Sequence, residues 1–155
     1  MALVRPATSK DTEGIVSLVR EVYGEYDCVL DLENEEKYLL EAGEFFRAGG
    51  GEFWVVEDEG RIRATVAVLL SEGAGELKTL YVHSSLRRQG WGRRLVELAT
   101  DYARRAGKAR LFLWSDTRFV EAHRLYRSMG FDERGTRELK DLNNSVEYGF
   151  EKRLR

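Results

Sequence analysis

The feature of this sequence that most constrains its fold is a glycine-rich turn between an apolar run and an amphipathic helix. The apolar run covers residues 77–82. The turn after it reads Arg87-Arg88-Gln89-Gly90-Trp91-Gly92. Apolar residues then recur at helical spacing over residues 95–106, Gly107 is placed as a helix stop, and residues 111–114 form a second apolar run. This order predicts a strand, a loop, a helix and a second strand that is covered on both faces.

The turn has the properties of an anion-binding site. Two glycines one residue apart let backbone N–H groups approach a bound anion, and the helix beginning near Trp91 adds the positive end of its dipole. Four arginines crowd this helix start: Arg87, Arg88, Arg93 and Arg94. The dipole disfavours a cation there by about 0.3–1 kcal/mol, and a bound polyanion would reverse that sign. The turn therefore indicates a phosphate site, although arginines that only solvate a loop are the simpler alternative.

The rest of the chain reads as further strands and helices. Helical spacing predicts helices over residues 11–22 and 33–46, after a strand at residues 3–5. Residues 52–57 and 61–70 flank a short turn sequence and predict an antiparallel hairpin.

The C-terminal part predicts one more helix and one more strand. A helix that Asp116 or Thr117 could cap, and that Gly130 stops, carries on one side Phe119, Ala122, His123, Tyr126 and Met129. The final strand is indicated by the alternation of Val146, Tyr148 and Phe150.

Length and composition bound the function classes. A chain of 155 residues with 43% hydrophobic residues is the size of one domain, residues 1–155. Its one cysteine, Cys28, excludes an intrachain disulfide, and no pair has zinc-site spacing, so we expect no metal. The N-terminus lacks a signal-peptide pattern and no run is long enough to span a membrane, so we expect a cytoplasmic protein. The formal net charge of -2 gives no overall attraction to nucleic acid.

Two motifs stand at a fixed separation in the C-terminal half. The first is Glu76-Leu77-Lys78-Thr79-Leu80-Tyr81-Val82 followed by Arg87-x-x-Gly90-x-Gly92. The second is Ala122-x-x-Leu125-Tyr126-x-x-x-Gly130-Phe131. Together they resemble the GCN5-related N-acetyltransferases, the GNAT family. The resemblance covers the C-terminal half in motif detail and implies an α/β (α+β) fold, with a mixed, centrally splayed sheet of about six to seven strands and about four helices. It also implies acetyl transfer from acetyl-CoA to an amine.

The resemblance implies where acetyl-CoA, the acyl-donor cosubstrate, would bind. A bulge in the strand before the turn would free backbone N–H groups for the thioester and pantetheine at Leu80, Tyr81 and Val82. The pyrophosphate would lie over the N–H groups of Arg88, Gln89, Gly90, Trp91, Gly92 and Arg93. Arg87 and Arg88 could add charge-assisted hydrogen bonds. Trp91 stands where a smaller aliphatic residue is usual, and a hydrophobic plug is its simpler role.

The resemblance also implies catalytic residues. Tyr126 matches a tyrosine that faces the cofactor sulfur, and a phenol with a pKa near 10 can protonate a departing thiolate. A core tyrosine is the alternative. Glu76 matches an acidic residue that contacts the amine, while an ordinary exposed glutamate is equally consistent. His83 is an alternative base because imidazole titrates near pH 6.5. The chain departs from the family at Phe119, where an asparagine usually binds pantetheine, and Ser115, Asp116 or Thr117 could compensate.

The segment between the first two helices suggests the acceptor. It contains two aromatic residues among acidic ones: Glu21, Tyr23, Glu25, Tyr26, Asp27 and Asp31. This composition could attract a cationic amine, although a solvated acidic loop is the simpler alternative. The partners we expect are therefore acetyl-CoA and an amine acceptor, without nucleic acid or membrane, and a homodimer is common in the family. A non-catalytic acyl-CoA sensor remains the alternative, and nucleic-acid binding through the arginines ranks last.

Overall fold

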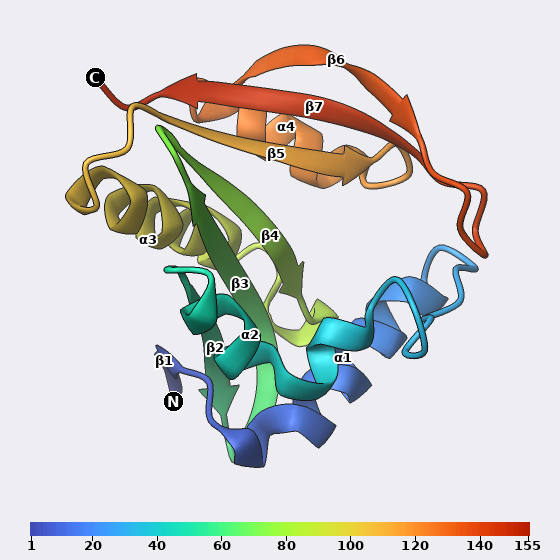
Figure 1. Ribbon diagram of the computed structural model, residues 1–155. Helices are drawn as coiled ribbons and strands as arrows, with labels where there is room; N and C mark the ends of the chain where they lie inside the picture. The colour runs from blue at the N-terminus through green and yellow to red at the C-terminus, as the bar shows by residue number, and fades with distance from the viewer.

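The computed structural model describes residues 1–155 as a seven-stranded sheet with the strand order β1-β2-β3-β4-β5-β7-β6 (Figure 1). The strands are β1 (Ala2–Pro6), β2 (Glu52–Asp58), β3 (Arg61–Ser71), β4 (Ala74–Val82), β5 (Arg110–Asp116), β6 (Asp132–Glu138) and β7 (Val146–Arg153). The helices are α1 (Thr12–Gly24), α2 (Ala42–Ala48), α3 (Trp91–Arg105) and α4 (Val120–Ser128), with 3-10 turns η1 (Ser9–Asp11), η2 (Lys37–Glu41) and η3 (Ser84–Leu86). The expected mixed sheet with four helices is confirmed.

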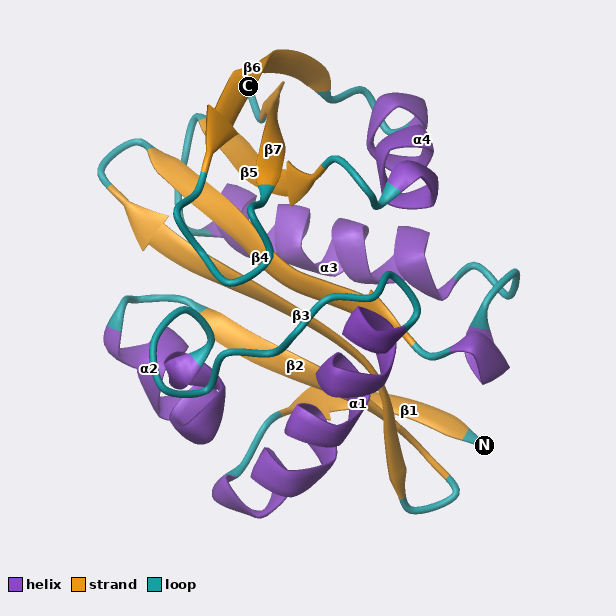
Figure 2. Ribbon diagram, turned by 90° about the vertical axis from the view of Figure 1, so that its right-hand side faces the viewer, coloured by secondary structure: helices purple, strands orange, loops and turns teal.

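Helices cover both faces of the sheet around β2 and β3 (Figure 2). The side chains of β2 alternate between two cores because successive residues of a strand point to opposite faces. Phe53 and Val55 pack with α1 and α2, whereas Trp54 and Val56 pack with α3. A strand buried on both faces shows a continuous apolar run, as β2 does.

The sheet splays between β4 and β5, the only parallel pair of neighbours. The two strands are paired only from Ala74 to Glu76 of β4. Beyond this point they diverge (Figure 1), and the edge of β4 that faces β5 has no strand partner. The splay therefore leaves backbone groups of residues 77–82 available to a ligand.

A β-bulge lies in β4 within this unpaired stretch. Tyr81 pairs with Thr65, and Lys78 pairs with Ala67, so Thr79 and Leu80 both stand opposite Val66. Thr79 adopts a left-handed conformation with φ 57°, and its carbonyl accepts a 2.7 Å hydrogen bond from the buried Thr65 hydroxyl. The bulge was expected at Leu80, Tyr81 and Val82. It lies one residue earlier, at Thr79 and Leu80.

The structure differs from the sequence-based expectation in the helix over residues 33–46 and in how β5 is covered. The predicted helix over residues 33–46 is reduced to η2 and α2. The carboxylate of Asp31 accepts hydrogen bonds from the N–H groups of Glu33 and Asn34, which holds the chain in a turn instead. Residues 111–114 were expected to form a strand that is covered on both faces, but helices cover only one face of β5. The helices of the other face, α1 and α2, pack on β2, β3 and β4.

Two further differences lie beyond β5. Helix α4 begins after Phe119 and has no side-chain cap. Asp116, one of the two expected caps, accepts a hydrogen bond from the N–H of Arg118, which lies before the helix. Strand β6 gave no sequence signal, because all its residues are exposed and its sequence, DERGTRE, has no apolar alternation. It pairs only with β7 as a charged edge strand, which limits pairing with other chains.

Candidate active site

A cleft of about 660 Å³ occupies the splay between β4 and β5. It extends from the glycine-rich turn, past the unpaired edge of β4, to the β6–β7 loop. Ten of the residues predicted from the sequence line it: Glu76, Leu80, Tyr81, Val82, Arg87, Arg88, Gly90, Trp91, Gly92 and Tyr126. Gln89 and Arg93 belong to the same turn but are not among the lining residues. The fold thus brings the two sequence motifs to one cavity.

The two glycines of the turn have different structural roles. Gly90 precedes α3 with φ 80°, a left-handed conformation that residues with a Cβ rarely adopt. Gly92 lies in the first turn of α3, where a Cβ atom would come within 3.0 Å of Leu125 on α4. Gly90 therefore sets the backbone path of the turn, and Gly92 permits the close approach of α3 and α4.

The turn presents a continuous set of free backbone donors. None of the N–H groups of residues 88–93 donates to a backbone carbonyl, and the first such bond of α3 runs from Arg94 to Gly90 at 3.1 Å. Residues 88–90 are also exposed to solvent. Free N–H groups at a helix N-terminus are suited to a phosphate group, since the helix dipole adds to their own partial charges. These residues are the same ones that the sequence assigned to the pyrophosphate.

The arginines around the turn are not equivalent. The guanidinium of Arg87 makes two hydrogen bonds to the Glu25 carboxylate, at 2.6 and 2.9 Å, and a third to the Val82 carbonyl. Arg93 donates to the Ser128 hydroxyl, and the guanidinium of Arg94 lies 3.9 Å from the Trp91 ring centroid. Arg88 makes no ion pair. Arg88 is therefore the arginine left free for a phosphate, while Arg87 joins the turn to the end of α1.

Trp91 and Tyr126 are both buried, with 6% and 3% of their surfaces exposed. Trp91 belongs to the hydrophobic core, in agreement with the plug expected from its size. Tyr126 packs against the rings of Phe131 and Phe150. Burial is the sole cause acting on its hydroxyl, which makes no hydrogen bond in the protein, and it raises the pKa of Tyr126 well above its ordinary value. The phenol is consequently protonated at neutral pH and free to donate.

The candidate bases differ in how their side chains are engaged. Glu76 is the last residue of β4 that pairs with β5, its side chain is 23% exposed, and its carboxylate lies 3.8 Å from the Lys78 ammonium. His83 is outside the cleft, with its Nε2 atom 3.1 Å from the Glu21 carboxylate. His123 is buried, with Nε2 3.1 Å from the Ser115 hydroxyl, and burial lowers its pKa. Of the three, Glu76 alone lines the cleft.

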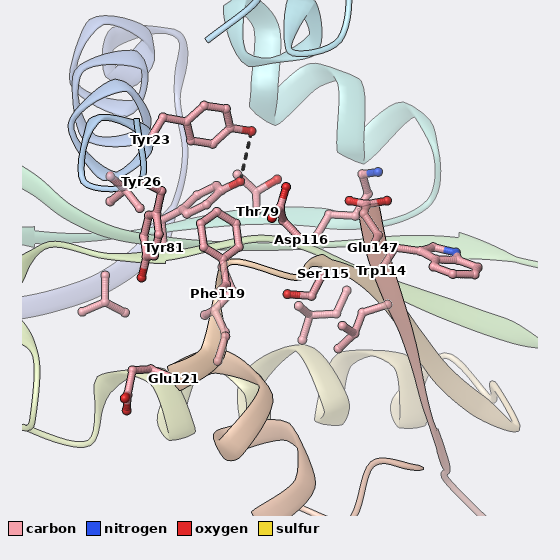
Figure 3. A pocket seen from close by; sticks show the side chains of 18 of the residues that line it. Tyr23, Tyr26, Thr79, Tyr81, Trp114, Ser115, Asp116, Phe119, Glu121 and Glu147 are labelled. Carbon is pink, nitrogen blue, oxygen red and sulfur yellow. Dashed lines mark hydrogen bonds between the residues drawn. The ribbon is translucent and has the colours of Figure 1, made fainter. Parts of the chain in front are cut away.

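An aromatic wall closes one side of the cleft (Figure 3). The hydroxyls of Tyr23 and Tyr81 are 3.4 Å apart, and the Phe119 ring lies beside Tyr81 with 6.3 Å between centroids. Tyr26 also contacts Phe119, with centroids 4.8 Å apart. Phe119 thus supplies an apolar surface at the position where the sequence resemblance implied an asparagine. Of the proposed replacements, Ser115 and Asp116 line the cleft. Ser115 is already paired with His123, and Asp116 is paired with Arg118.

Sequence reasoning misplaced the acidic residues of the cleft. Glu21 is paired with His83, Glu25 with Arg87, and Asp31 holds the turn that follows it. The carboxylates that line the cavity come from separate parts of the chain: Glu35, Glu36, Glu76, Asp116, Glu121, Asp141 and Glu147. No local pattern connects them, because the loop after α1 and the β6–β7 loop meet only in the folded chain.

Comparisons with known proteins agree with this geometry. A sequence model described as "Acetyltransferase (GNAT) family" matches residues 15–131. The chain is 27% identical over 136 residues to the uncharacterized N-acetyltransferase YjgM of Escherichia coli K12, covering 84% of this chain and 81% of that protein. A GNAT-family acetyltransferase from Staphylococcus aureus Mu50 superposes with a TM-score of 0.83 at 16% identity, with both chains covered completely.

A Salmonella typhimurium acetyltransferase, whose structure contains its cofactor acetyl-CoA, has the same fold, with a TM-score of 0.78 at 19% identity over 100% of this chain and 95% of that one. The family match and the named relative define the class of protein as an acyl-CoA-dependent N-acetyltransferase. The chain belongs to the GNAT acetyltransferase family, as its motifs indicated. None of its helices has the length and apolar character needed to cross a bilayer.

Proposed function

We propose that this protein transfers an acetyl group from acetyl-CoA to a primary amine by direct attack within a ternary complex. The observation that carries the proposal is the pair of unengaged donors in one cleft. The N–H groups of residues 88–93 make no backbone hydrogen bond at one end, and deeper inside the hydroxyl of Tyr126, a residue that is only 3% exposed, makes none either. The first set fits a diphosphate, and the second fits a departing sulfur.

The donor side of the cleft fits an extended molecule of coenzyme A. The pyrophosphate would rest on the N–H groups of Arg88, Gln89, Gly90, Trp91, Gly92 and Arg93, with the Arg88 side chain adding charge. The pantetheine arm would run along the unpaired edge of β4, taking the place of the strand partner that the splay removes. At the bulge, the backbone N–H groups near Leu80 and Tyr81 would face the thioester. One donor of this kind to a developing oxyanion contributes about 2.7–4 kcal/mol.

The reaction joins the amine nitrogen to the acetyl carbonyl carbon and breaks the carbon–sulfur bond. Glu76 would accept the proton that the nitrogen loses, directly or through water, and Tyr126 would donate a proton to the sulfur. Burial makes the phenol of Tyr126 a weaker acid. The departing thiolate would be buried beside it, and desolvation would raise the pKa of its thiol in the same way. The two groups therefore remain matched for proton transfer.

The proposal is tested by measuring acetyl-CoA binding and amine-dependent thiol release separately. Calorimetry is expected to show one acetyl-CoA site per chain, and thiol release is expected to require both acetyl-CoA and a primary amine. Binding without thiol release for any amine in a broad panel would favour the acyl-CoA sensor. Absence of binding would contradict the assignment of the glycine-rich turn.

The variant Glu76→Gln tests the proposed base. We expect kcat to fall about tenfold or more near pH 7, because the amide cannot accept the proton of the attacking amine. The difference in kcat between the variant and the wild type should become smaller as pH rises, since a growing share of the amine then enters the site already neutral. The measurement is a pH–rate profile of the variant beside the wild type. A constant deficit at all pH values would argue for a structural role of Glu76.

A further inference from the structure

One carboxylate in the cleft has an oxygen atom that is buried without a hydrogen-bond partner. Glu36 precedes η2 and is only 6% exposed, yet its side chain lines the cleft. Its Oε1 atom accepts a 3.3 Å hydrogen bond from the N–H of Asp31. Its Oε2 atom is the one buried side-chain nitrogen or oxygen in the protein that has no hydrogen-bond partner. Buried polar atoms in native proteins are nearly always paired, so this oxygen requires an explanation.

Two loops enclose the end of the cleft that contains Glu36. The side chain of Asn143, in the β6–β7 loop, donates to the Val29 carbonyl at 2.9 Å and accepts from the Val29 N–H at 2.8 Å. The Arg118 guanidinium in turn donates to the Asn143 carbonyl at 2.8 Å. Figure 1 shows the loop after α1 lying beside the β6–β7 loop. The two halves of the splayed sheet are thus connected over the cleft, which keeps Glu36 away from bulk water.

The charged groups that act most strongly on Glu36 are acidic. They are Asp31 and Glu35 on its own segment and Asp141 on the β6–β7 loop. Its charge also acts on the hydroxyls of Tyr23 from α1, Tyr38 from η2 and Tyr81 from β4. Burial, with these acidic neighbours, raises the pKa of Glu36 to about 7.

Apart from Arg88, which belongs to the glycine-rich turn at the other end, the cations in and beside the cleft already pair with carboxylates. Lys78 lies 3.8 Å from Glu76, Arg137 donates to Glu147 at 2.7 Å, and Arg118 donates to Asp116 at 2.9 Å. A buried carboxylate among acidic neighbours is costly when ionised, and a cation that enters from outside removes that cost. The nearby tyrosine rings offer such a cation further attraction through their faces.

We propose that Glu36 binds a positively charged nitrogen of the acceptor, and that the acceptor is a diamine or polyamine whose other amino group is acetylated. This inference rests on the proposed function. A nitrogen held on a carboxylate keeps its proton and lacks the lone pair needed to attack a thioester. The attacking amine must be neutral and must lie at the unpaired edge of β4. Two nitrogens with separate roles are therefore required.

The test compares two amines that differ only in the second nitrogen. We expect diaminobutane to bind the protein saturated with CoA at least tenfold more tightly than butylamine, measured by calorimetry. Glu36→Gln should remove this preference, since glutamine keeps the acceptor for the Asp31 N–H but has no charge. Glu33→Gln is the matched control, because Glu33 is exposed, lies outside the cleft and carries the same charge. Its preference for diaminobutane should equal that of the wild type.

The pH dependence gives a second readout that needs no variant. Because the second nitrogen pairs with ionised Glu36, the ratio of the affinities for diaminobutane and butylamine should increase as pH rises through about 7. Equal binding of the two amines by the wild type, or an unchanged preference in Glu36→Gln, would overturn the inference. Failure of the wild type to release thiol with any amine would instead contradict the proposed function and leave the calorimetric comparison valid.

Discussion

Replacing Gly90 with valine is expected to raise the Kd for acetyl-CoA about a hundredfold, which corresponds to about 2.7 kcal/mol. Gly90 has φ 80°, and a left-handed conformation costs a residue with a Cβ about 1–2 kcal/mol, more for a β-branched one. The turn relieves this strain by changing its backbone path. The N–H groups of residues 88–93 then lose their common direction, and each hydrogen bond to a charged group is worth about 1.5–3 kcal/mol.

Gly60→Val is the control for this variant. Gly60 has nearly the same conformation, φ 78°, and a Cβ there would meet no atom within 4 Å, as at Gly90. It lies in the hairpin turn between β2 and β3, outside the cleft. Both variants should therefore lose similar free energy of unfolding, measured in urea, but only Gly90→Val should lose acetyl-CoA affinity. Unchanged affinity in a folded Gly90→Val protein would place the pyrophosphate elsewhere.

Tyr126→Phe is expected to lower kcat by about 10²–10³ while leaving the Kd for acetyl-CoA nearly unchanged. The hydroxyl makes no hydrogen bond within the protein, so its removal leaves no partner unsatisfied and should scarcely change the free energy of unfolding. Because burial raises the pKa of Tyr126, the hydroxyl stays protonated well into the alkaline range. The kcat of the wild type should therefore not fall as the pH rises through about 10, the ordinary pKa of tyrosine.

Tyr102→Phe provides the matched comparison. The Tyr102 hydroxyl, on the side of α3 that faces β2, donates to the carbonyls of Gly50 and Gly51 at 2.9 and 3.2 Å. It lies outside the cleft. This variant should lose about 1 kcal/mol of stability and keep its kcat, the reverse of Tyr126→Phe. A kcat for Tyr126→Phe within a factor of about three of the wild type would remove Tyr126 from the proton transfer.

The glycine-rich turn shows how much a local pattern can predict. The strand before it, the helix after it and the free N–H groups within it depend on residues close together in the chain. Gly90 and Gly92 could both be recognised as necessary, although Gly92 proved to serve the contact with Leu125 on α4. Trp91 was also predicted correctly as a core residue, because a large apolar side chain at the start of an amphipathic helix is usually buried.

Features that depend on distant pairing were missed or misplaced. The bulge begins at Thr79 rather than Leu80, because its position depends on the register between β3 and β4 and on the Thr65 hydroxyl. The sequence offered Arg87 and Arg88 alike as phosphate contacts and gave no sign that Arg87 pairs with Glu25, which lies far away in the sequence. Strand β6 has no apolar residues, so only its pairing with β7 identifies it as a strand.

The sequence by itself determined the family, the enzyme class, the mixed α/β fold and the segment that presents free amides to an anion. These follow from short-range periodicity and from motifs whose residues are neighbours in the chain. Only the tertiary structure decided which arginine remains free, where β4 bulges, and that one carboxylate oxygen of Glu36 is buried in the cleft without a partner. The physical reason is that ion pairs, strand register and burial are set by groups that come together from separate segments, and no local spacing records such contacts.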